Sequence, residues 1–192
     1  EYNPDMVDLS RTNAAAAGVS TAQATFVKAD LFETDLSKAT VITMYLLPEV
    51  NLQLRPSLLK LQPGTRIVSH DWDMGDWQPD RTTTLDVPEK VVGREKRSRV
   101  HLWWVPAPVA GLWCGPAGQQ LKLEQQFQAV QGRLDAGSTS SAALGRISGK
   151  TVTLHGLNGE LRLEWTGPGQ MRLVSASGLW SQGALNRVWH QP

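Results

Sequence analysis

The first hundred residues alternate between helix-forming and strand-forming patterns. Asn3 and Pro4 are typical of a helix start, and Gly18 of a helix end, so residues 4–17 are predicted to be helical. Short apolar runs rich in β-branched residues predict strands over residues 25–30, 39–45 and 65–70, with a second helix over residues 50–61. The run 39–45 is nearly continuous and predicts a strand buried on both faces. Strands alternating with helices at this spacing predict βαβ units and a parallel sheet.

The second half has a different pattern, with short strands separated by glycines. Strands are expected over residues 99–105, 120–130, 150–155, 160–165, 171–175 and 186–190. Such spacing predicts a meander, a sandwich or a small barrel. The run Pro106-Ala107-Pro108 marks the expected boundary between the two patterns. We therefore predict an α/β domain over residues 1–106 and a small all-β domain over residues 107–192.

Composition narrows the classes of protein. The chain has 192 residues, of which 41% are hydrophobic, and this favours a folded core over disorder. Its net charge of +1 gives no reason to expect a nucleic-acid partner. A single cysteine, Cys114, excludes an intrachain disulfide and a zinc cage built from thiolates. The sequence contains no run of about 20 apolar residues of the kind that crosses a membrane.

Two carboxylates are expected to end neighbouring strands on either side of the first helix. Glu1 and Asp30 have the spacing of a pair that binds an adenosine across the top of a sheet. One carboxylate accepts hydrogen bonds from the ribose hydroxyls, and the other accepts from the adenine amine. The side chains proposed to pack against the base are Tyr2, Met6, Leu31 and Phe32. The alternative is that Glu1 is a frayed terminus and Asp30 a helix cap.

Two further segments follow strands of the expected parallel sheet, where ligands of such sheets bind. Tyr45, Leu46 and Pro48 come after the run 39–45, and alone they are also typical of a strand that ends in a proline turn. His70 and Asp71 open a polar loop that has the groups for a general base or a metal site. We favour a polar loop with inward-packed tryptophans over a metal site. The charged run 94–99 is interpreted as a solvated strand edge rather than a phosphate site.

Read together, these segments resemble the class I S-adenosylmethionine-dependent methyltransferases, in a bacterial subgroup that carries a C-terminal β-domain. The segments that carry the resemblance are residues 1–6 (EYNPDM), 26–32 (FVKADLF), 39–48 (ATVITMYLLP), 54–59 (LRPSLL), 63–69 (PGTRIVS) and 65–80. The resemblance covers residues 1–106 and implies a partial Rossmann-like methyltransferase sheet, followed by the β-domain.

The resemblance implies a role for each candidate residue. S-adenosylmethionine is the expected cofactor, with Glu1 at its ribose and Asp30 at its adenine. Tyr45, Leu46 and Pro48 would line the methyl-transfer site, and His70 or Asp71 would orient the acceptor. The acceptor is expected to be a protein, with lysine as one option, or a small molecule. The family's glycine-rich cofactor loop does not occur in the sequence, so we expect an N-terminally truncated chain that by itself is a poor cofactor binder and inactive.

Two alternatives come from other classes. A nicotinamide or flavin oxidoreductase would also place a carboxylate after its second strand. An antiparallel hairpin that includes residues 100–105 would favour the methyltransferase instead. A binding module centred on the tryptophan-rich β-domain would cluster three or more tryptophans on one open face. Dependence on a cytosolic cofactor favours the cytoplasm, although export stays open, and the oligomeric state is not readable from the sequence.

Overall fold

The computed structural model describes residues 1–91, 95–115, 118–156, 159–178 and 188–192. The chain divides into two compact units, Glu1–Lys38 and Ala39–Pro192, which are described separately below. The boundary predicted from the sequence, at residues 106–107, lies inside the second unit and stays a prediction about domains. No helix in the described part of the chain is long and apolar enough to cross a membrane.

The first unit consists of helix α1 (Pro4–Ala16) and an extended segment that returns along it. The Asn3 side chain accepts a hydrogen bond from the Asp5 N–H and caps the helix, and Pro4 occupies the first turn, where a missing N–H costs nothing. The helix ends before Gly18, whose φ of 71° suits a residue without a side chain. The predicted helix is therefore present with its predicted ends.

The predicted strand over residues 25–30 is wrong as a strand, because these residues are extended without a ladder. They make two backbone hydrogen bonds to the start of the chain. Glu1 donates its N–H to the Val27 carbonyl at 3.2 Å, and the Ala29 N–H donates to the Glu1 carbonyl at 3.0 Å. This is the pattern of one parallel pairing. A single pairing is too short to count as a strand, but it does place Glu1 beside residues 27–29.

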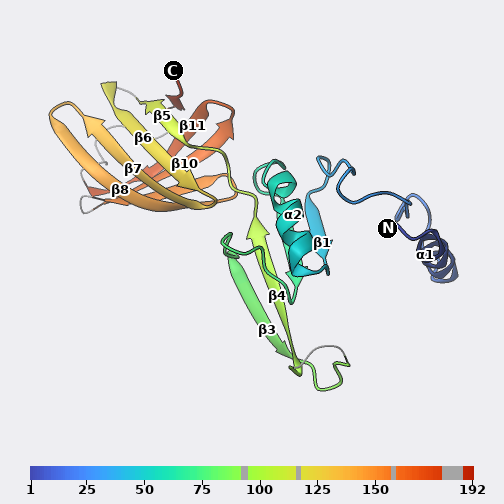
Figure 1. Cartoon of the computed structure of the whole chain (residues 1–192). Helices are drawn as coiled ribbons and strands as arrows, with labels where there is room; N and C mark the ends of the chain where they lie inside the picture. Colours follow the sequence, from blue (N-terminus) through green and yellow to red (C-terminus); the bar gives the residue numbers. More distant parts are fainter. Residues whose placement is uncertain (92–94, 116–117, 157–158, 179–187) are drawn as a thin grey trace. The chain divides into compact units, whose positions relative to one another are not determined.

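The second unit begins with a four-stranded sheet in the order β1-β2-β4-β3 (Figure 1). Its strands are β1 (Val41–Met44), β2 (Arg66–His70), β3 (Arg81–Asp86) and β4 (Arg97–Trp104). β1 and β2 are parallel, as predicted, and form one βαβ unit with α2 (Pro48–Leu58). β4 runs antiparallel to both of its neighbours, β2 and β3.

β4 is the element that separates the two enzyme classes considered from the sequence. β3 leaves a gap beside β2, and β4 returns in the opposite direction to fill it, so the sheet ends in an antiparallel hairpin that contains Val100 to Trp104. That is the arrangement expected of a methyltransferase sheet rather than of the oxidoreductase alternative. The fold class predicted from the sequence, a partial methyltransferase-like sheet with a small β-domain, is confirmed.

Helix α2 covers one face of the sheet. Leu54 and Leu58, four residues apart and therefore on one side of the helix, are buried, and Pro56 lies within the helix without ending it. The prediction that residues 39–45 form a strand buried on both faces is wrong. β1 is at the edge, with β2 its only pairing partner in the described residues, and the side chain of Val41 is 41% exposed. An edge strand lacks the neighbours that bury both faces.

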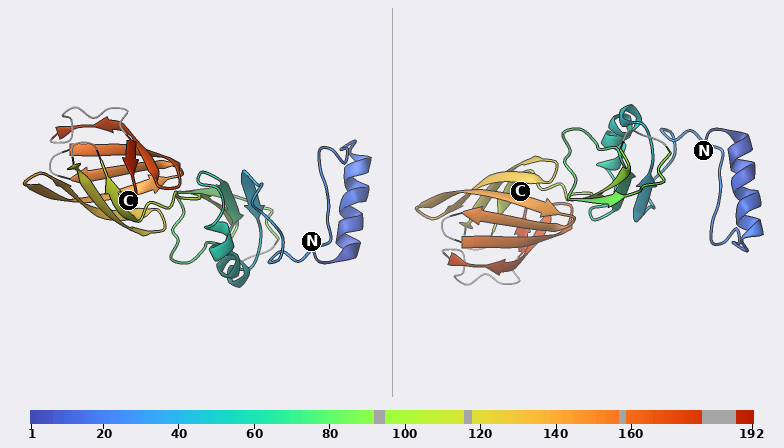
Figure 2. Two further views of the ribbon diagram at one scale, coloured as in Figure 1. Left: turned by 90° about the horizontal axis from the view of Figure 1, so that it is seen from above. Right: turned by 90° about the horizontal axis from the view of Figure 1, so that it is seen from below.

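The rest of the chain forms a closed, eight-stranded antiparallel barrel in which every strand pairs with its neighbours in sequence, and β12 closes onto β5 (Figures 1 and 2). Its strands are β5 (Gly111–Cys114), β6 (Gln120–Gln126), β7 (Ala129–Ala136), β8 (Thr139–Ser148), β9 (Thr151–Gly156), β10 (Gly159–Gly167), β11 (Gln170–Ala176) and β12 (Val188–His190). A small barrel was one of the three predicted architectures. Closure leaves no strand edge open.

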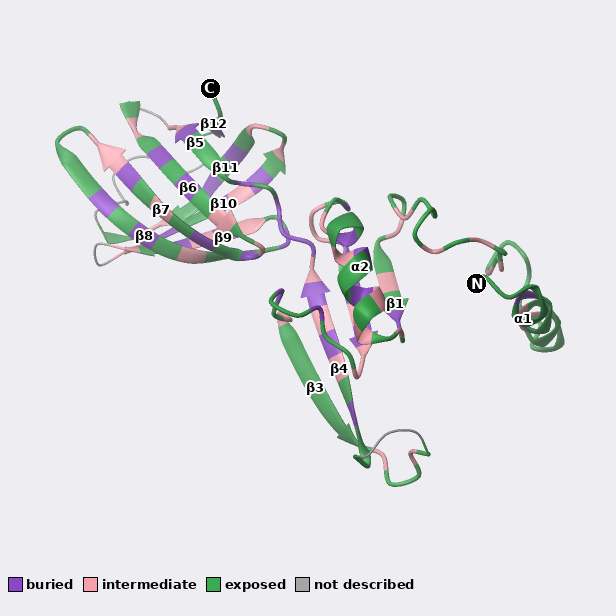
Figure 3. Ribbon diagram, in the orientation of Figure 1, coloured by how far each residue is buried: buried purple, intermediate pink, exposed green. Residues whose placement is uncertain are grey.

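Side chains fill the interior of the barrel, as eight strands allow. The alternation of buried and exposed residues along its strands is visible in Figure 3. The buried cluster includes Trp113, Trp165 and Trp189 together with Leu, Ile, Val and Met side chains. Among the described tryptophans, only Trp72 is exposed, and Trp180 lies outside the described residues. The open tryptophan cluster that the binding-module alternative required is therefore absent from the described part.

Within the described strands of the barrel, an added Cβ would come closer than 3 Å to a backbone oxygen of the neighbouring strand at Gly132, Gly145 and Gly156. At Gly145 an added Cβ would lie 2.0 Å from the Thr153 carbonyl oxygen, a backbone atom that cannot move away. We expect Gly145→Ala to lower the free energy of unfolding by about 3 kcal/mol or more, because overpacking forces the β8–β9 ladder apart. Urea unfolding followed by tryptophan fluorescence measures the change. Gly167→Ala is the matched control, since nothing lies within 4 Å of its added Cβ. Equal effects of the two substitutions would contradict the barrel geometry.

Candidate functional site

The first unit holds all six residues predicted to bind the cofactor. The Glu1 carboxylate accepts a hydrogen bond from the Asn3 N–H at 2.8 Å, and this bond is the main reason that its pKa lies below the usual value. The Asp30 carboxylate accepts from the Phe32 N–H at 2.8 Å. Both carboxylates remain exposed to solvent. Because an ionised carboxylate has about four acceptor positions, each keeps capacity for a ligand hydroxyl or amine.

The backbone pairing described above brings the two predicted carboxylates to neighbouring chain segments. Apolar side chains accompany them, and they are largely open: Tyr2 is 75% exposed, Phe32 51% and Met6 47%, whereas Leu31 is half-buried. Exposed aromatic and thioether groups beside a carboxylate pair have the chemistry to cover an adenine ring. The roles given to these residues stay predictions.

The second unit brings together three of the five residues predicted to act in catalysis. The rings of Tyr45, after β1, and His70, at the end of β2, lie 4.4 Å apart with a 41° tilt. His70 Nε2 is 3.6 Å from the Asp71 Oδ1 atom. Leu46 is half-buried and precedes Pro48, which is the first residue of α2. All of these residues lie where β1 and β2 end, as the parallel sheet predicts.

Asp71 is held in an uncommon conformation by charges and hydrogen bonds. Its φ is 63°, in the left-handed region that few residues other than glycine adopt. Its N–H donates to the Arg99 carbonyl at 2.7 Å, and its Oδ1 accepts from the Arg99 N–H at 2.8 Å. Burial opposes ionisation, yet the hydrogen bonds from Lys90 and Arg99 and the nearby His70 together hold the pKa of Asp71 below its usual range.

Lys90 is a site residue that the sequence analysis missed. Its ammonium donates to the Asp71 Oδ2 atom and to the Arg97 carbonyl, and its side chain is only 12% exposed. Lys90 is 19 residues from Asp71 in the sequence, in a turn that resembles many solvated turns. No local pattern identifies such a partner, because the β3–β4 hairpin creates the contact.

The loop after β2 is also fixed by helix α2. Asn51, which is fully buried, donates to the carbonyls of Trp72 and Asp73. Arg55 donates to the Met74 carbonyl at 2.8 Å and pairs with Asp76. The prediction of inward-packed tryptophans holds for Trp77 only, because Trp72 is 43% exposed. Among the described residues, no three His, Cys, Asp or Glu side chains are placed to hold a metal ion.

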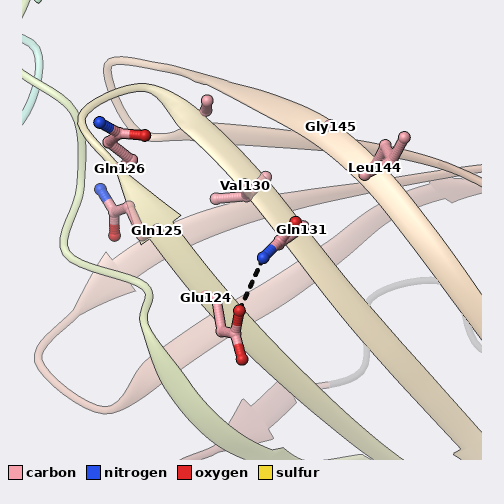
Figure 4. A pocket seen from close by; sticks show the side chains of 8 residues that line it. Glu124, Gln125, Gln126, Val130, Gln131, Leu144 and Gly145 are labelled. Atoms are coloured by element: carbon pink, nitrogen blue, oxygen red, sulfur yellow. Dashed lines mark hydrogen bonds between the residues drawn. The ribbon is translucent and has the colours of Figure 1, made fainter.

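The described part of the charged run 94–99 is consistent with the predicted solvated strand edge. Residues 97–99 open β4 and form a ladder with β3 only, because the ladder with β2 begins at Val100. Arg97 pairs there with Asp86, and Arg99 with Glu95. Arg94 lies outside the described residues. A separate shallow pocket of about 500 Å³ lies on the outside of the barrel, over β6, β7 and β8 (Figure 4). There Gln131 donates to Glu124 at 2.7 Å, and none of the predicted site residues lines it.

The sheet with its inserted antiparallel strand is the arrangement expected of a methyltransferase sheet. The resemblance to class I S-adenosylmethionine-dependent methyltransferases is confirmed by comparison with known proteins. Residues 1–81 match the family model described as the ANTKMT methyltransferase domain. The matched segment contains every residue predicted for the cofactor and catalytic sites and ends at the first residue of β3.

Two relatives are similar to this chain. A protein-lysine N-methyltransferase of Saccharolobus islandicus (strain REY15A) is 45% identical over 87 residues, which are 45% of this chain and 53% of that protein. The chain thus spans about half the length of that curated relative. The crystal structure of an RNA methyltransferase from Salinibacter ruber in complex with S-adenosyl-L-homocysteine is 46% identical, with a TM-score of 0.50. The match covers 57% of this chain and 65% of that one.

The Lys90–Asp71 pair has a pH dependence of known sign. Because the pKa of Asp71 is lowered in the folded protein, its carboxylate adds stability above its ordinary pKa and loses it as the pH falls through the lowered value. We expect Lys90→Met to reduce the free energy of unfolding at pH 7 by about 2 kcal/mol, as for other hydrogen bonds to charged groups. The difference from the unsubstituted protein should shrink as the pH falls below the ordinary pKa of an aspartate, about 3.9.

Urea unfolding at pH 7 and at acidic pH measures this effect. Arg97→Met is the matched control, because it removes an ion pair whose side chains are 63% and 79% exposed. Exposed pairs contribute well under about 1 kcal/mol. A Lys90 variant as stable as the Arg97 variant at pH 7 would contradict the pairing described here.

Proposed function

We propose that this protein transfers a methyl group from S-adenosylmethionine to the amino group of a protein lysine. The observation that carries the methyl transfer is the insertion of antiparallel β4 between β2 and β3, which separates a methyltransferase sheet from an oxidoreductase sheet. The lysine acceptor is supported by the similarity to a protein-lysine N-methyltransferase. The match of residues 1–81 to a methyltransferase family model supports the methyl transfer independently.

The donor set in the first unit fits an adenosine. Glu1 and Asp30 are exposed carboxylates on adjoining segments, and their acceptor oxygens suit the ribose hydroxyls and the adenine amine. Tyr2, Met6 and Phe32 supply the apolar cover for the ring. S-adenosylmethionine, when bound, supplies an electrophilic methyl group on its sulfonium, so the protein contributes placement rather than covalent chemistry.

Tyr45 and His70 are the groups proposed to receive the acceptor. A lysine ammonium must lose a proton before its nitrogen can attack, and His70 has the chemistry of a general base. Hydrogen bonds to the Arg99 backbone hold Asp71 in place. Its Oδ1 atom lies 3.6 Å from Nε2 of His70. The tilted Tyr45 ring offers an aromatic face that attracts a cation before deprotonation.

RNA is the second candidate acceptor, because the Salinibacter ruber neighbour is named an RNA methyltransferase. The near-neutral charge of this chain, +1, favours the protein acceptor, since binding to a phosphate backbone needs several unpaired cations. A test of the acceptor therefore has to offer both protein and RNA.

Calorimetric titration of S-adenosylhomocysteine into this chain and into the full-length natural protein tests cofactor binding. We expect Asp30→Asn to weaken binding about tenfold, the effect of one charge-assisted hydrogen bond. Asp35→Asn is the matched control. Asp35 accepts from the N–H two residues later at 2.9 Å, as Asp30 does, but it is not a predicted cofactor residue. Equal losses in the two variants, or no binding by the full-length protein, would contradict the proposal.

A methylation assay tests the acceptor. With radiolabelled S-adenosylmethionine, lysine-rich protein and RNA are offered separately to the full-length natural protein and to its His70→Gln variant. We expect labelling of protein lysines, a decrease of about 100-fold in kcat for the variant, and an unchanged Kd for S-adenosylhomocysteine. Labelling confined to RNA would replace the lysine acceptor with RNA. A fully active His70 variant would remove the role given to His70.

A further inference from the structure

We propose that the β6–β7 hairpin of the barrel is a positioning element for the acceptor loop (residues 70–80), acting through the ring of Phe127. The proposal rests on the proposed function, because residues 70–72 of this loop carry the groups assigned to the acceptor. The barrel would then contribute to the reaction by holding the acceptor loop in place, and not by binding a ligand itself.

The hairpin has an unusual backbone at its tip. β6 and β7 are joined through Phe127 and Gln128, and Phe127 has a φ of 52°. Two-residue hairpins need positive φ values there and usually use asparagine or glycine, which adopt them at little cost. A bulky aromatic residue in this conformation persists only where its surroundings hold it, and such outliers are concentrated at functional sites.

The Phe127 ring is supported by contacts with the acceptor loop and with helix α2. The Trp77 ring stacks on it, with centroids 6.1 Å apart and an 18° angle. The Arg55 guanidinium lies 5.3 Å above the same ring. Trp77 is fully buried, and Trp103 of β4 donates its indole N–H to the Trp77 carbonyl at 2.9 Å. The hairpin tip therefore packs against the end of the acceptor loop and the helix that holds the loop.

Polar contacts reinforce the same junction. Gln128 is buried and donates its side-chain N–H to the Gln78 carbonyl. Arg146 of β8 pairs with Asp80 at 2.6 Å, and the Asp80 side chain is only 4% exposed. The other Asp80 oxygen accepts the Trp104 N–H at 2.9 Å. The barrel thus binds the loop at residues 77–80 and fixes them to the last residue of β4.

The two ends of the acceptor loop are consequently held from different sides. Asp71 is held by Lys90 and the Arg99 backbone, and residues 77–80 are held by the barrel. Between these two ends, Asn51 and Arg55 of α2 donate hydrogen bonds to the carbonyls of Asp73 and Met74. Arg55 also contacts the Phe127 ring. Loss of the Phe127 ring frees Arg55 and Trp77 together. A displacement of the reacting groups by even an ångström slows a reaction that depends on placement.

Phe127→Asn tests the proposal, because asparagine relieves the backbone strain and keeps the hairpin while removing the ring. In the full-length natural protein, we expect amide hydrogen exchange in residues 70–80 to accelerate at least tenfold, with residues 139–156 of the barrel unchanged. We also expect kcat for methyl transfer to fall about tenfold with an unchanged Kd for S-adenosylhomocysteine. Phe127→Tyr should restore both the slow exchange and kcat, because it keeps the aromatic ring.

Leu144→Ala is the matched control. Leu144 is 67% exposed on the outer surface of the barrel and should affect neither readout. Unchanged exchange in residues 70–80 of Phe127→Asn, or faster exchange with unchanged kcat, would overturn the proposal and leave Phe127 as a cover for Trp77. If the unsubstituted protein transfers no methyl group, the proposed function fails by itself. The exchange measurement then still decides whether Phe127 holds the loop.

Discussion

The insertion of β4 between β2 and β3 is the constraint on which the rest of the second unit depends. By pairing antiparallel with both strands, β4 places Arg99 beside Asp71, and so fixes the residue that follows His70. It also places Trp103 against the carbonyl of Trp77 and delivers the chain to the barrel, where Ala107 donates its N–H to the Gly149 carbonyl. One strand therefore organises the acceptor loop, the sheet and the start of the barrel.

Two residues with a left-handed backbone, one in the acceptor loop and one in the hairpin that contacts it, are costly on their own and are stabilised only by their neighbours. Asp71 has a left-handed backbone and is largely buried, and Phe127 has the same kind of backbone in the facing hairpin. Ion pairing and backbone hydrogen bonds offset the first cost, while ring stacking and a cation above the ring offset the second. Asp71 lies within the acceptor loop and Phe127 contacts its other end, at Trp77, so the loop connects the barrel to the ends of β1 and β2.

The sequence predicted the elements whose signals are local. Asn3, Pro4 and Gly18 gave the ends of α1, and the apolar runs gave β1 and β2. β3 was missed because all six of its residues are exposed and carry no alternation. β8 was missed because two of its three buried positions are Ser141 and Ala143, and only the third, Ile147, is a large apolar side chain. β6 and β7 were merged because Phe127 and Gln128 give no turn signal.

The candidate site was predictable only as far as parallel-strand topology allows. Tyr45 and His70 were expected near each other because they end adjacent parallel strands, and their rings do meet. Lys90, Arg55 and Phe127 were not expected, because they reach the loop through a hairpin, a helix and a separate barrel. Contacts between segments this far apart in sequence have no periodic signal.

The central claim is that the cofactor is bound by the residues predicted for it, at Glu1 to Met6 and Asp30 to Phe32, and not by the barrel. Ultraviolet crosslinking of methyl-labelled S-adenosylmethionine to the full-length natural protein, followed by peptide mapping, tests it most directly. The account predicts label in the peptides that contain Glu1 to Met6, Asp30 to Phe32 or Tyr45, and competition by S-adenosylhomocysteine. Competed label confined to the barrel peptides would contradict it.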